Sequence, residues 1–486
     1  MHWIDAAIFV AYMFAMLGIG FYFLRKNRGG DDYYVGGRKM GATHVGLSVV
    51  ATDVGGGFSI GLGGLGFSMG ISGSWMLFTG LLGAWLSAVI LIPRIKRNPA
   101  FDKALTFPEF FRVFYGPNAA LIAGVISAIG YLGFTSSQIL AGSKLADGTF
   151  VDLDQGTALI VMGGIAVAYT VMGGLKAVIY TDTVQWIVLM VGLIFIGIPI
   201  SYDAIGGWDA VVAAVEPEML SFGNITWSKA LNWAVTIVPI WFVGMTLYQR
   251  IYACKDEKTA KRAWFIAGLL EWPIMAMMGV MLGLFARVAA QQGLFAPMGH
   301  PDAAGMDAEV GLPMLLGTVL PVGLMGITMS AYFSAILSTA DSCLMAASGN
   351  LVSDIVGRFA KIDPNRRWFV LISQMATLGL GGIALLLASL MTNVLDLMLY
   401  SYAFMVSGLF VPVLGALFWK RRSPAAAVTA MVVGGGTTVA LGLAFEELPL
   451  GLDANLFGIG ASAAVFVVLT LSNGSSPSAS RSSSRE

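Results

Sequence analysis

The sequence predicts an all-α membrane protein with about thirteen transmembrane helices. Three observations support this prediction: the apolar composition, the length of the apolar segments, and the distribution of basic residues between those segments. Hydrophobic residues make up 57% of the 486 positions and charged residues only 12%, and the mean hydropathy is +0.78. Because soluble domains carry about 25% charged residues, we expect most of this chain to be solvated by lipid.

A helix needs about 20 mostly apolar residues to cross a bilayer. The first apolar segment lacks the basic flank and small-residue cleavage site of a signal peptide, so we expect it to remain as a helix. The segments that meet the length criterion are 4–24, 43–69, 71–95, 118–142, 157–175, 180–203, 228–252, 262–289, 320–348, 367–391, 395–419, 425–445 and 455–472.

The basic residues give an independent check on this helix count, because cytoplasmic loops are enriched in Lys and Arg. If the N-terminus lies outside, the outer segments contain only Lys144, Lys229 and Arg287 of the 28 Lys and Arg residues. All the others, Arg250 among them, then fall on the cytoplasmic side. A miscounted helix would mix the two sets, so we predict a bacterial inner-membrane protein with an outer N-terminus and a cytoplasmic C-terminus.

Several function classes are excluded by composition. The 28 basic residues balance the 28 acidic residues, which argues against a nucleic-acid partner. The two cysteines, Cys254 and Cys343, form neither a disulfide framework nor a zinc-binding pattern. No nucleophile and base are arranged as in an enzyme, so we expect no enzymatic activity. The Ser-rich stretch 473–486 reads as a disordered cytoplasmic tail, which leaves residues 1–472 as one transmembrane transporter domain.

The second apolar segment departs from a simple spanning helix. Three consecutive glycines, Gly55, Gly56 and Gly57, follow Asp53 closely. Each mid-helix glycine costs on the order of 1 kcal/mol, and a carboxylate in the membrane costs roughly 2.5–3.5 kcal/mol. Close helix packing would explain the glycines alone, but not the adjacent carboxylate. We therefore predict a discontinuous helix whose freed carbonyls face a ligand site.

The ninth apolar segment concentrates side-chain oxygens. Ser338, Thr339, Asp341 and Ser342 lie within five residues, and Ala335 shares a helix face with Ser338. A single hydroxyl of this kind often only bonds back to its own helix. The whole cluster favours a site for a hard cation such as sodium, which prefers oxygen ligands.

Two further places carry polar or disruptive residues. Asp182 follows a predicted tight turn at 173–177, where it could cap a helix N-terminus or lie on an ion path. In the seventh segment, Pro239 is expected to break the helix, and Trp241 could line that break or lie at the membrane interface. Glu271 is a further intramembrane carboxylate with no partner that the sequence identifies.

The spacing of the interruptions predicts an internal repeat. Segments two to six (about 43–203) and seven to eleven (about 228–419) form two halves of five helices, each opening on an interrupted helix. Because five is odd, the second half is inverted relative to the first. Corresponding interruptions in two inverted halves indicate the central site of a secondary transporter.

Four motifs of the chain resemble the sodium:solute symporter family: DDYYVGGRKMG at 31–41, GGLKAVIYTDTVQ at 173–185, STADSCLMAASGNLVSDI at 338–355, and Tyr-Gln-Arg at 248–250. The resemblance implies the LeuT-type five-plus-five inverted repeat, with one extra N-terminal and two extra C-terminal helices. It also implies symport driven by sodium, with no organic cofactor.

The resemblance further implies a sodium site. It would use backbone carbonyls of Ala51 and Val54 in the first core helix. From the ninth segment it would take the carbonyl of Ala335 and the hydroxyls of Ser338 and Thr339. Asp182 matches the family's carboxylate beneath that site.

The resemblance implies a small organic solute as the substrate, and the motifs are most similar to the proline and choline branches of the family. Choline carriers place a cage tryptophan where this chain has Asp53, and a second one near Gly244, which disfavours choline. An amino acid such as proline or a similar zwitterion is therefore preferred, with Asp53, Gly55, Gly56, Trp241 and Gly244 as candidate substrate residues. A monocarboxylate, pantothenate or a sugar remains an alternative solute. A proton-coupled symporter of the same fold, an ion channel and a membrane sensor remain alternative functions.

Overall fold

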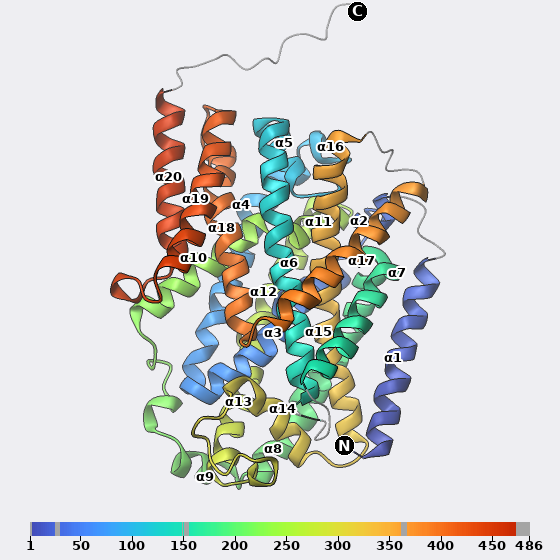
Figure 1. Cartoon of the computed structure of the whole chain (residues 1–486), viewed down its shortest axis with the longest axis vertical. Helices are drawn as coiled ribbons and strands as arrows, with labels where there is room; N and C mark the ends of the chain where they lie inside the picture. The colour runs from blue at the N-terminus through green and yellow to red at the C-terminus, as the bar shows by residue number, and fades with distance from the viewer. Residues whose placement is uncertain (1, 25–29, 148, 150–154, 361–366, 473–486) are drawn as a thin grey trace, which may run out of the picture.

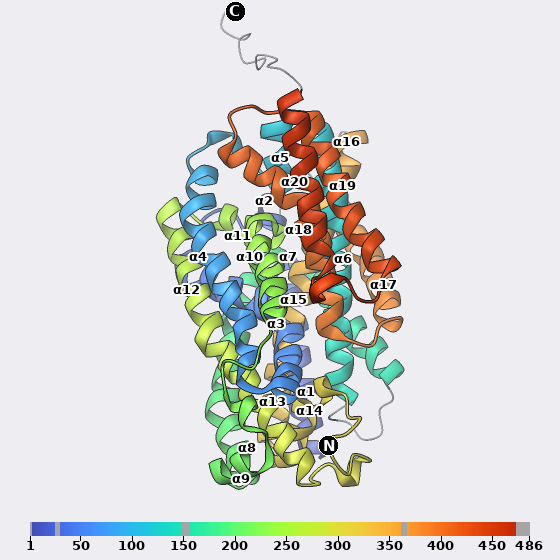
Figure 2. The same ribbon diagram turned by 90° about the vertical axis from the view of Figure 1, so that its left-hand side faces the viewer.

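The computed structural model describes the chain except residues 1, 25–29, 148, 150–154, 361–366 and 473–486. The predicted tail at 473–486 therefore lies outside the described residues. In the described part the regular structure is helical, apart from one isolated bridge between Met40 and Cys254. Figures 1 and 2 show an elongated bundle in which α1 (Trp3–Leu24) begins at one end and α20 (Ala454–Ser472) finishes at the other. An odd number of membrane crossings requires the two termini to lie at opposite ends of the bundle.

The first half of the chain forms a run of helices joined by short connections. They are α2 (Gly30–Val35), α3 (Ala42–Met69), α4 (Trp75–Lys96), α5 (Pro108–Tyr115), α6 (Pro117–Asp147), α7 (Gln155–Met190), α8 (Ile198–Ala204) and α9 (Gly207–Ala214).

The second half continues the run of helices. They are α10 (Trp227–Val243), α11 (Met245–Ala253), α12 (Glu257–Leu269), α13 (Ala276–Gln291), α14 (Ala308–Val319), α15 (Leu324–Gly349), α16 (Gly357–Phe359), α17 (Arg367–Ser389), α18 (Val394–Phe418) and α19 (Pro424–Ala444).

Each of the thirteen predicted segments coincides with helix. By length and hydropathy, eight helices in the described residues qualify as membrane spans, and the bent pair α10 and α11 makes a ninth. α1 and the first part of α7 contribute only shorter apolar stretches, Trp3–Ile19 and Gly156–Met172. α15 fails the hydropathy criterion because it is rich in hydroxyl groups, yet nearly all of its side chains are buried against other helices. It needs no apolar exterior because protein, not lipid, surrounds it.

The interruptions of the helices agree with the predictions in two cases and correct them in one. α3 is interrupted at Gly55, as predicted. The prediction that Pro239 breaks the seventh segment is wrong: Pro239 lies within α10, and the chain bends by 41° at Gly244, between α10 and α11. Glycine has no side chain to resist that change of direction. The predicted turn at 173–177 agrees with the contact between the hydroxyls of Tyr169 and Thr181, which lie 2.9 Å apart, whereas a straight helix would separate residues at this spacing by about 18 Å.

α3 and α15 form the centre of the bundle. α3 packs on α12, α13, α14 and α15, while α15 also packs on α6 and α7. Small residues allow this close approach: a Cβ atom on Gly66 would lie 2.2 Å from the Val280 carbonyl oxygen, and one on Gly283 would lie 1.9 Å from that of Gly63. Several glycines of α3 therefore serve helix packing, in contrast to Gly55.

Candidate sodium and substrate site

The interruption of α3 faces α15 directly. Gly55 has φ of +29° and ψ of −169°, a conformation that residues with a side chain rarely adopt. A Cβ atom at this position would lie 1.9 Å from Thr339 Oγ1. Both backbone conformation and space therefore require glycine here, and its absence of a side chain brings the α3 backbone against the hydroxyl of Thr339.

Four of the five residues predicted as sodium ligands lie together at this contact. Thr339 Oγ1 lies 2.9 Å from the carbonyl oxygen of Ala51 on α3 and 3.2 Å from that of Ala335 on its own helix. Ser338 Oγ lies 3.2 Å from the same Ala335 oxygen. All four residues are buried, and Val54 lies in the same part of α3, one residue before the interruption. Neutral carbonyl and hydroxyl oxygens of this kind suit a small hard cation.

The contact between Thr339 and Ala51 distinguishes two readings of the hydroxyl cluster. A hydroxyl that only bonds back to its own helix touches one helix, as Ser338 does. Thr339 instead joins α15 to α3, which are 288 residues apart in sequence at this point. The oxygens of two helices therefore converge at the place where one of them is interrupted.

We expect Gly55→Ala to abolish most sodium-dependent uptake. The added methyl group would displace Thr339, and the left-handed backbone adds strain of about 1–3 kcal/mol. Uptake normalised to protein amount measures the effect. Gly164→Ala is the matched control, because no atom lies within 4 Å of the added carbon there. Normal uptake by Gly55→Ala would show that this close approach is unimportant.

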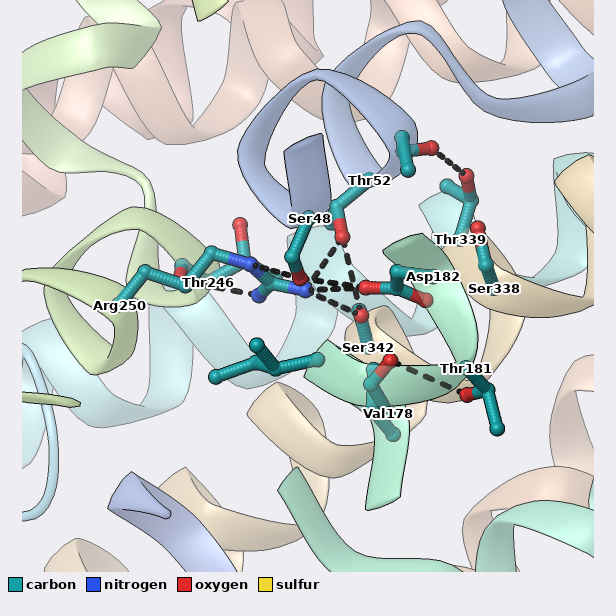
Figure 3. Close-up of polar contacts among 12 residues, drawn as sticks. Ser48, Thr52, Val178, Thr181, Asp182, Thr246, Arg250, Ser338, Thr339 and Ser342 are labelled. Carbon is teal, nitrogen blue, oxygen red and sulfur yellow. Dashed lines mark hydrogen bonds and ion pairs between the residues drawn. The ribbon is translucent and has the colours of Figure 1, made fainter. Parts of the chain in front are cut away.

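A buried polar network lies beside these oxygens, and Figure 3 shows its members converging on Arg250. The Arg250 guanidinium donates to the hydroxyls of Thr52 and Ser342 at 2.5 and 2.9 Å, to Ser48 at 3.0 Å, and to Asp182 Oδ2 at 3.2 Å. Ser48 also donates to Asp182 Oδ2 at 2.5 Å. Arg250 and Asp182 have no exposed side-chain surface, so this is a fully buried ion pair that connects α3, α7, α11 and α15.

This network resolves the place of Asp182 and corrects that of Arg250. Asp182 lies near the start of the span Val178–Ala204, and its charge is paired with Arg250. Counting Arg250 with the basic residues of the cytoplasmic surface is wrong, because its side chain is buried among four helices. The sequence signal for this buried arginine was the Tyr-Gln-Arg motif, which directly follows the predicted break in the seventh segment.

The structure brings together only some of the candidate substrate residues. Asp53 is 5% exposed and its Oδ1 accepts a hydrogen bond of 3.3 Å from the Tyr402 hydroxyl on α18. Gly244 lies beside Tyr131, whose hydroxyl contacts the Thr246 hydroxyl at 3.1 Å. Sequence reasoning missed both tyrosines, since single tyrosines in apolar segments carry no distinctive pattern. Gly55 is the residue at which α3 is interrupted, and Gly56 directly follows it.

Trp241 occupies a different environment. Its ring packs against Gly83 of α4, where a Cβ would lie 2.3 Å away, and makes an edge contact with Trp264 of α12 at 6.4 Å. The residue is fully buried, so the interpretation as a tryptophan at the membrane interface is wrong. Its large apolar ring fills the space between α4 and α12.

Comparison with known proteins places these features in a family. The model of the sodium:solute symporter family matches residues 33–434. The high-affinity proline transporter PutP of Bacillus subtilis (strain 168) is 28% identical over 437 residues, which cover 87% of this chain and 89% of the relative. The sodium/proline symporter of Escherichia coli (strain K12) is 28% identical over 445 residues, which cover 89% and 86%.

Solved structures show the same fold. A sodium-coupled sialic acid symporter in a substrate-bound outward-open state matches with a TM-score of 0.79 at 22% identity, over 96% of this chain and 98% of that one. Mhp1, a nucleobase-cation-symport-1 family transporter, matches with a TM-score of 0.58 at 14% identity, over 90% and 93%. The expected LeuT-type architecture is therefore present. The chain belongs to the sodium:solute symporter family, and it is accordingly a membrane-embedded, multi-pass secondary transporter that couples solute import to sodium, not an enzyme.

Proposed function

We propose that this chain imports an amino acid such as proline, or a similar small zwitterion, with sodium bound by Ala51, Val54, Ala335, Ser338 and Thr339. The contact of Thr339 Oγ1 with the Ala51 carbonyl across the interrupted helix carries the proposal. The names of the relatives, which are proline transporters, support the choice of solute. Asp53, with Tyr402 bonded to it, lies two residues from Ala51, so a zwitterion's cationic nitrogen would find a carboxylate there.

Sodium links the two inverted halves in this scheme. The repeats span about 43–203 and 228–419, and α3 and α15 belong to different repeats. An ion bound between them stabilises the arrangement in which the interruption of α3 is held against α15, and a solute that needs that arrangement then binds more tightly. Asp182 lies on the cytoplasmic path of the ion, where its pairing with Arg250 closes that path. The chain is oriented with its N-terminus outside the bacterial inner membrane.

The available driving force suits concentrative uptake. One sodium ion gains about 2.3 kcal/mol in crossing a potential of roughly 100 mV, and a tenfold gradient adds about 1.4 kcal/mol. Together these sustain a solute ratio of roughly 500.

Uptake of radiolabelled L-proline into proteoliposomes tests the proposal, with a panel of unlabelled amino acids, betaines, sugars and monocarboxylates as competitors. We expect uptake that requires an inward sodium gradient and is abolished when potassium replaces sodium at fixed pH. Equal uptake in potassium would overturn the assignment of sodium as the coupling ion. Sodium-dependent uptake of a competitor with no uptake of proline would overturn only the solute.

Asp53→Asn is expected to fold and insert normally while losing transport or sodium affinity. The carboxylate is costly in the membrane by roughly 2.5–3.5 kcal/mol, so its removal should not impair stability. Uptake against sodium concentration, together with thermal stability, measures both effects. The exposed Asp209 supplies the control substitution Asp209→Asn. Unchanged sodium dependence in Asp53→Asn would mean that Asp53 has no part in binding.

A further inference from the structure

Helix α1 precedes the two inverted repeats, and its first turn reaches the N-terminus of α15. The residue at the cap position of α15 is Gly323, which has no side chain to accept the N–H groups that a helix leaves free in its first turn. Asp5 of α1 supplies the acceptor: its Oδ1 accepts from the backbone N–H of Gly323 at 2.7 Å and from that of Gly326 at 2.8 Å. Asp5 is only 1% exposed, so the N-terminus of α15 is capped from within the protein by a different helix.

The contact between α1 and α15 extends beyond this cap. A Cβ atom on Gly326 would lie 2.7 Å from the Cα atom of Asp5, so the two backbones touch at that point. Farther along, the Tyr12 hydroxyl of α1 contacts the hydroxyl of Ser334, which directly precedes Ala335. α1 also packs on α7 at the edge of the bundle (Figure 1), so its own position does not depend on α15 alone.

The contacts with α1 and the proposed sodium ligands lie on opposite faces of α15. The α15 residues that meet α1 through hydrogen bonds, a ring contact or a shared buried apolar cluster are Gly326, Phe333, Ser334, Leu337 and Ala340. Because each residue of an α-helix is turned by about 100° from the one before it, Phe333 and Leu337 lie within about 20° of the direction of Gly326. Ala335 and Thr339 lie about 140–180° from that direction. α15 is therefore held between α1 on one face and the interrupted α3 on the other.

We propose that α1 is a support that holds α15 at the sodium site, and that Asp5 is the positioning residue that attaches the support. The inference rests on the proposed sodium ligands. Without the attachment, α15 would spend less time where the Thr339 hydroxyl meets the Ala51 carbonyl. The apparent dissociation constant rises in inverse proportion to the fraction of protein that is competent to bind, so sodium would bind more weakly, but a saturating concentration would still fill the site.

The thermal stability of the purified full-length protein, measured against sodium concentration without solute, tests this proposal. Asp5→Ala removes the acceptor of both N–H groups, and we expect it to raise the sodium concentration for half-maximal stabilisation by about threefold or more. Asp5→Asn should lie near wild type, because both N–H groups use a single oxygen and asparagine retains one. Asp256→Ala is the matched control: Asp256 caps α12 by accepting from the Thr259 N–H at 2.7 Å, so its loss should lower stability without changing the sodium dependence.

A steric variant keeps the test decisive if Asp5→Ala fails to fold. Gly326→Ala forces α1 away from α15 but removes no hydrogen-bonding group, and it should also raise the sodium requirement. Gly18→Ala, where no atom lies within 4 Å of the added carbon, should leave it unchanged.

A sodium dependence equal to that of wild type in both Asp5→Ala and Gly326→Ala, with only the stability lowered, would overturn the support. Thr339→Val, measured beside them, tells this failure from a failure of the proposed function. If Thr339→Val alone shifts the sodium dependence, the sodium site stands and only the support is overturned. If Thr339→Val also matches wild type, the proposed site is wrong and the inference falls with it.

Discussion

Arg250→Met is expected to destabilise the protein by about 3–5 kcal/mol. The substitution leaves the Asp182 carboxylate buried without its counter-ion, which is the costly way to break a buried pair. It also removes the donor that joins Ser48, Thr52 and Ser342. Asp182→Asn should be similarly harmful, because it leaves the guanidinium unpaired. Thermal unfolding of the purified variants measures both losses.

The double variant Arg250→Met/Asp182→Asn separates pairing from general damage. If the two charges stabilise each other, the double variant should be more stable than the sum of the single effects predicts. Arg97→Met provides the matched control, because Arg97 forms a comparable ion pair with Glu257 at the exposed surface and such pairs contribute little. Strictly additive losses would show that Arg250 and Asp182 act independently, and the proposal that their pairing closes the cytoplasmic path would then lack its basis.

The fold was largely predictable because lipid imposes a strict rule. A segment such as 395–419 must be apolar over about 20 residues and must satisfy its backbone internally, and it corresponds to α18 within one residue. Gly55 was predictable for a related reason: glycines beside a carboxylate have few explanations within a membrane. Hydropathy, charge placement and glycine clustering are all local properties that the sequence states directly.

The side-chain partners were not predictable, because they depend on tertiary contacts. Arg250 bonds to Ser48, 202 residues away in sequence, and no local pattern records which helix it meets. Glu271 fits against α4 only because Gly80 has no side chain in the space of its carboxyl group. The break at Gly244 instead of Pro239 likewise reflects its surroundings, since proline within a helix is tolerated where neighbours satisfy the freed carbonyl.

Thr339→Val is expected to raise the sodium concentration for half-maximal uptake by about tenfold or more, which corresponds to at least ~1.4 kcal/mol. Valine has nearly the shape of threonine but no oxygen, so the ion would lose one ligand and the bridge to the Ala51 carbonyl would be lost. Thr339→Ser keeps the oxygen and should have a mild effect. Ser338→Ala should also raise the sodium requirement, because Ser338 supplies the second hydroxyl of the proposed site.

Thr170→Val is the matched control, because the Thr170 hydroxyl only bonds back to Ala166 within α7 and should not affect the sodium curve. Linkage adds a second readout. If sodium tightens solute binding by some factor, solute tightens sodium binding by the same factor. A hydroxyl that touches only sodium therefore changes solute affinity mainly at low sodium, and saturating sodium should restore part of it. A Thr339→Val protein that matches wild type across the sodium range would show that sodium binds elsewhere, and that Thr339 only holds α15 to α3.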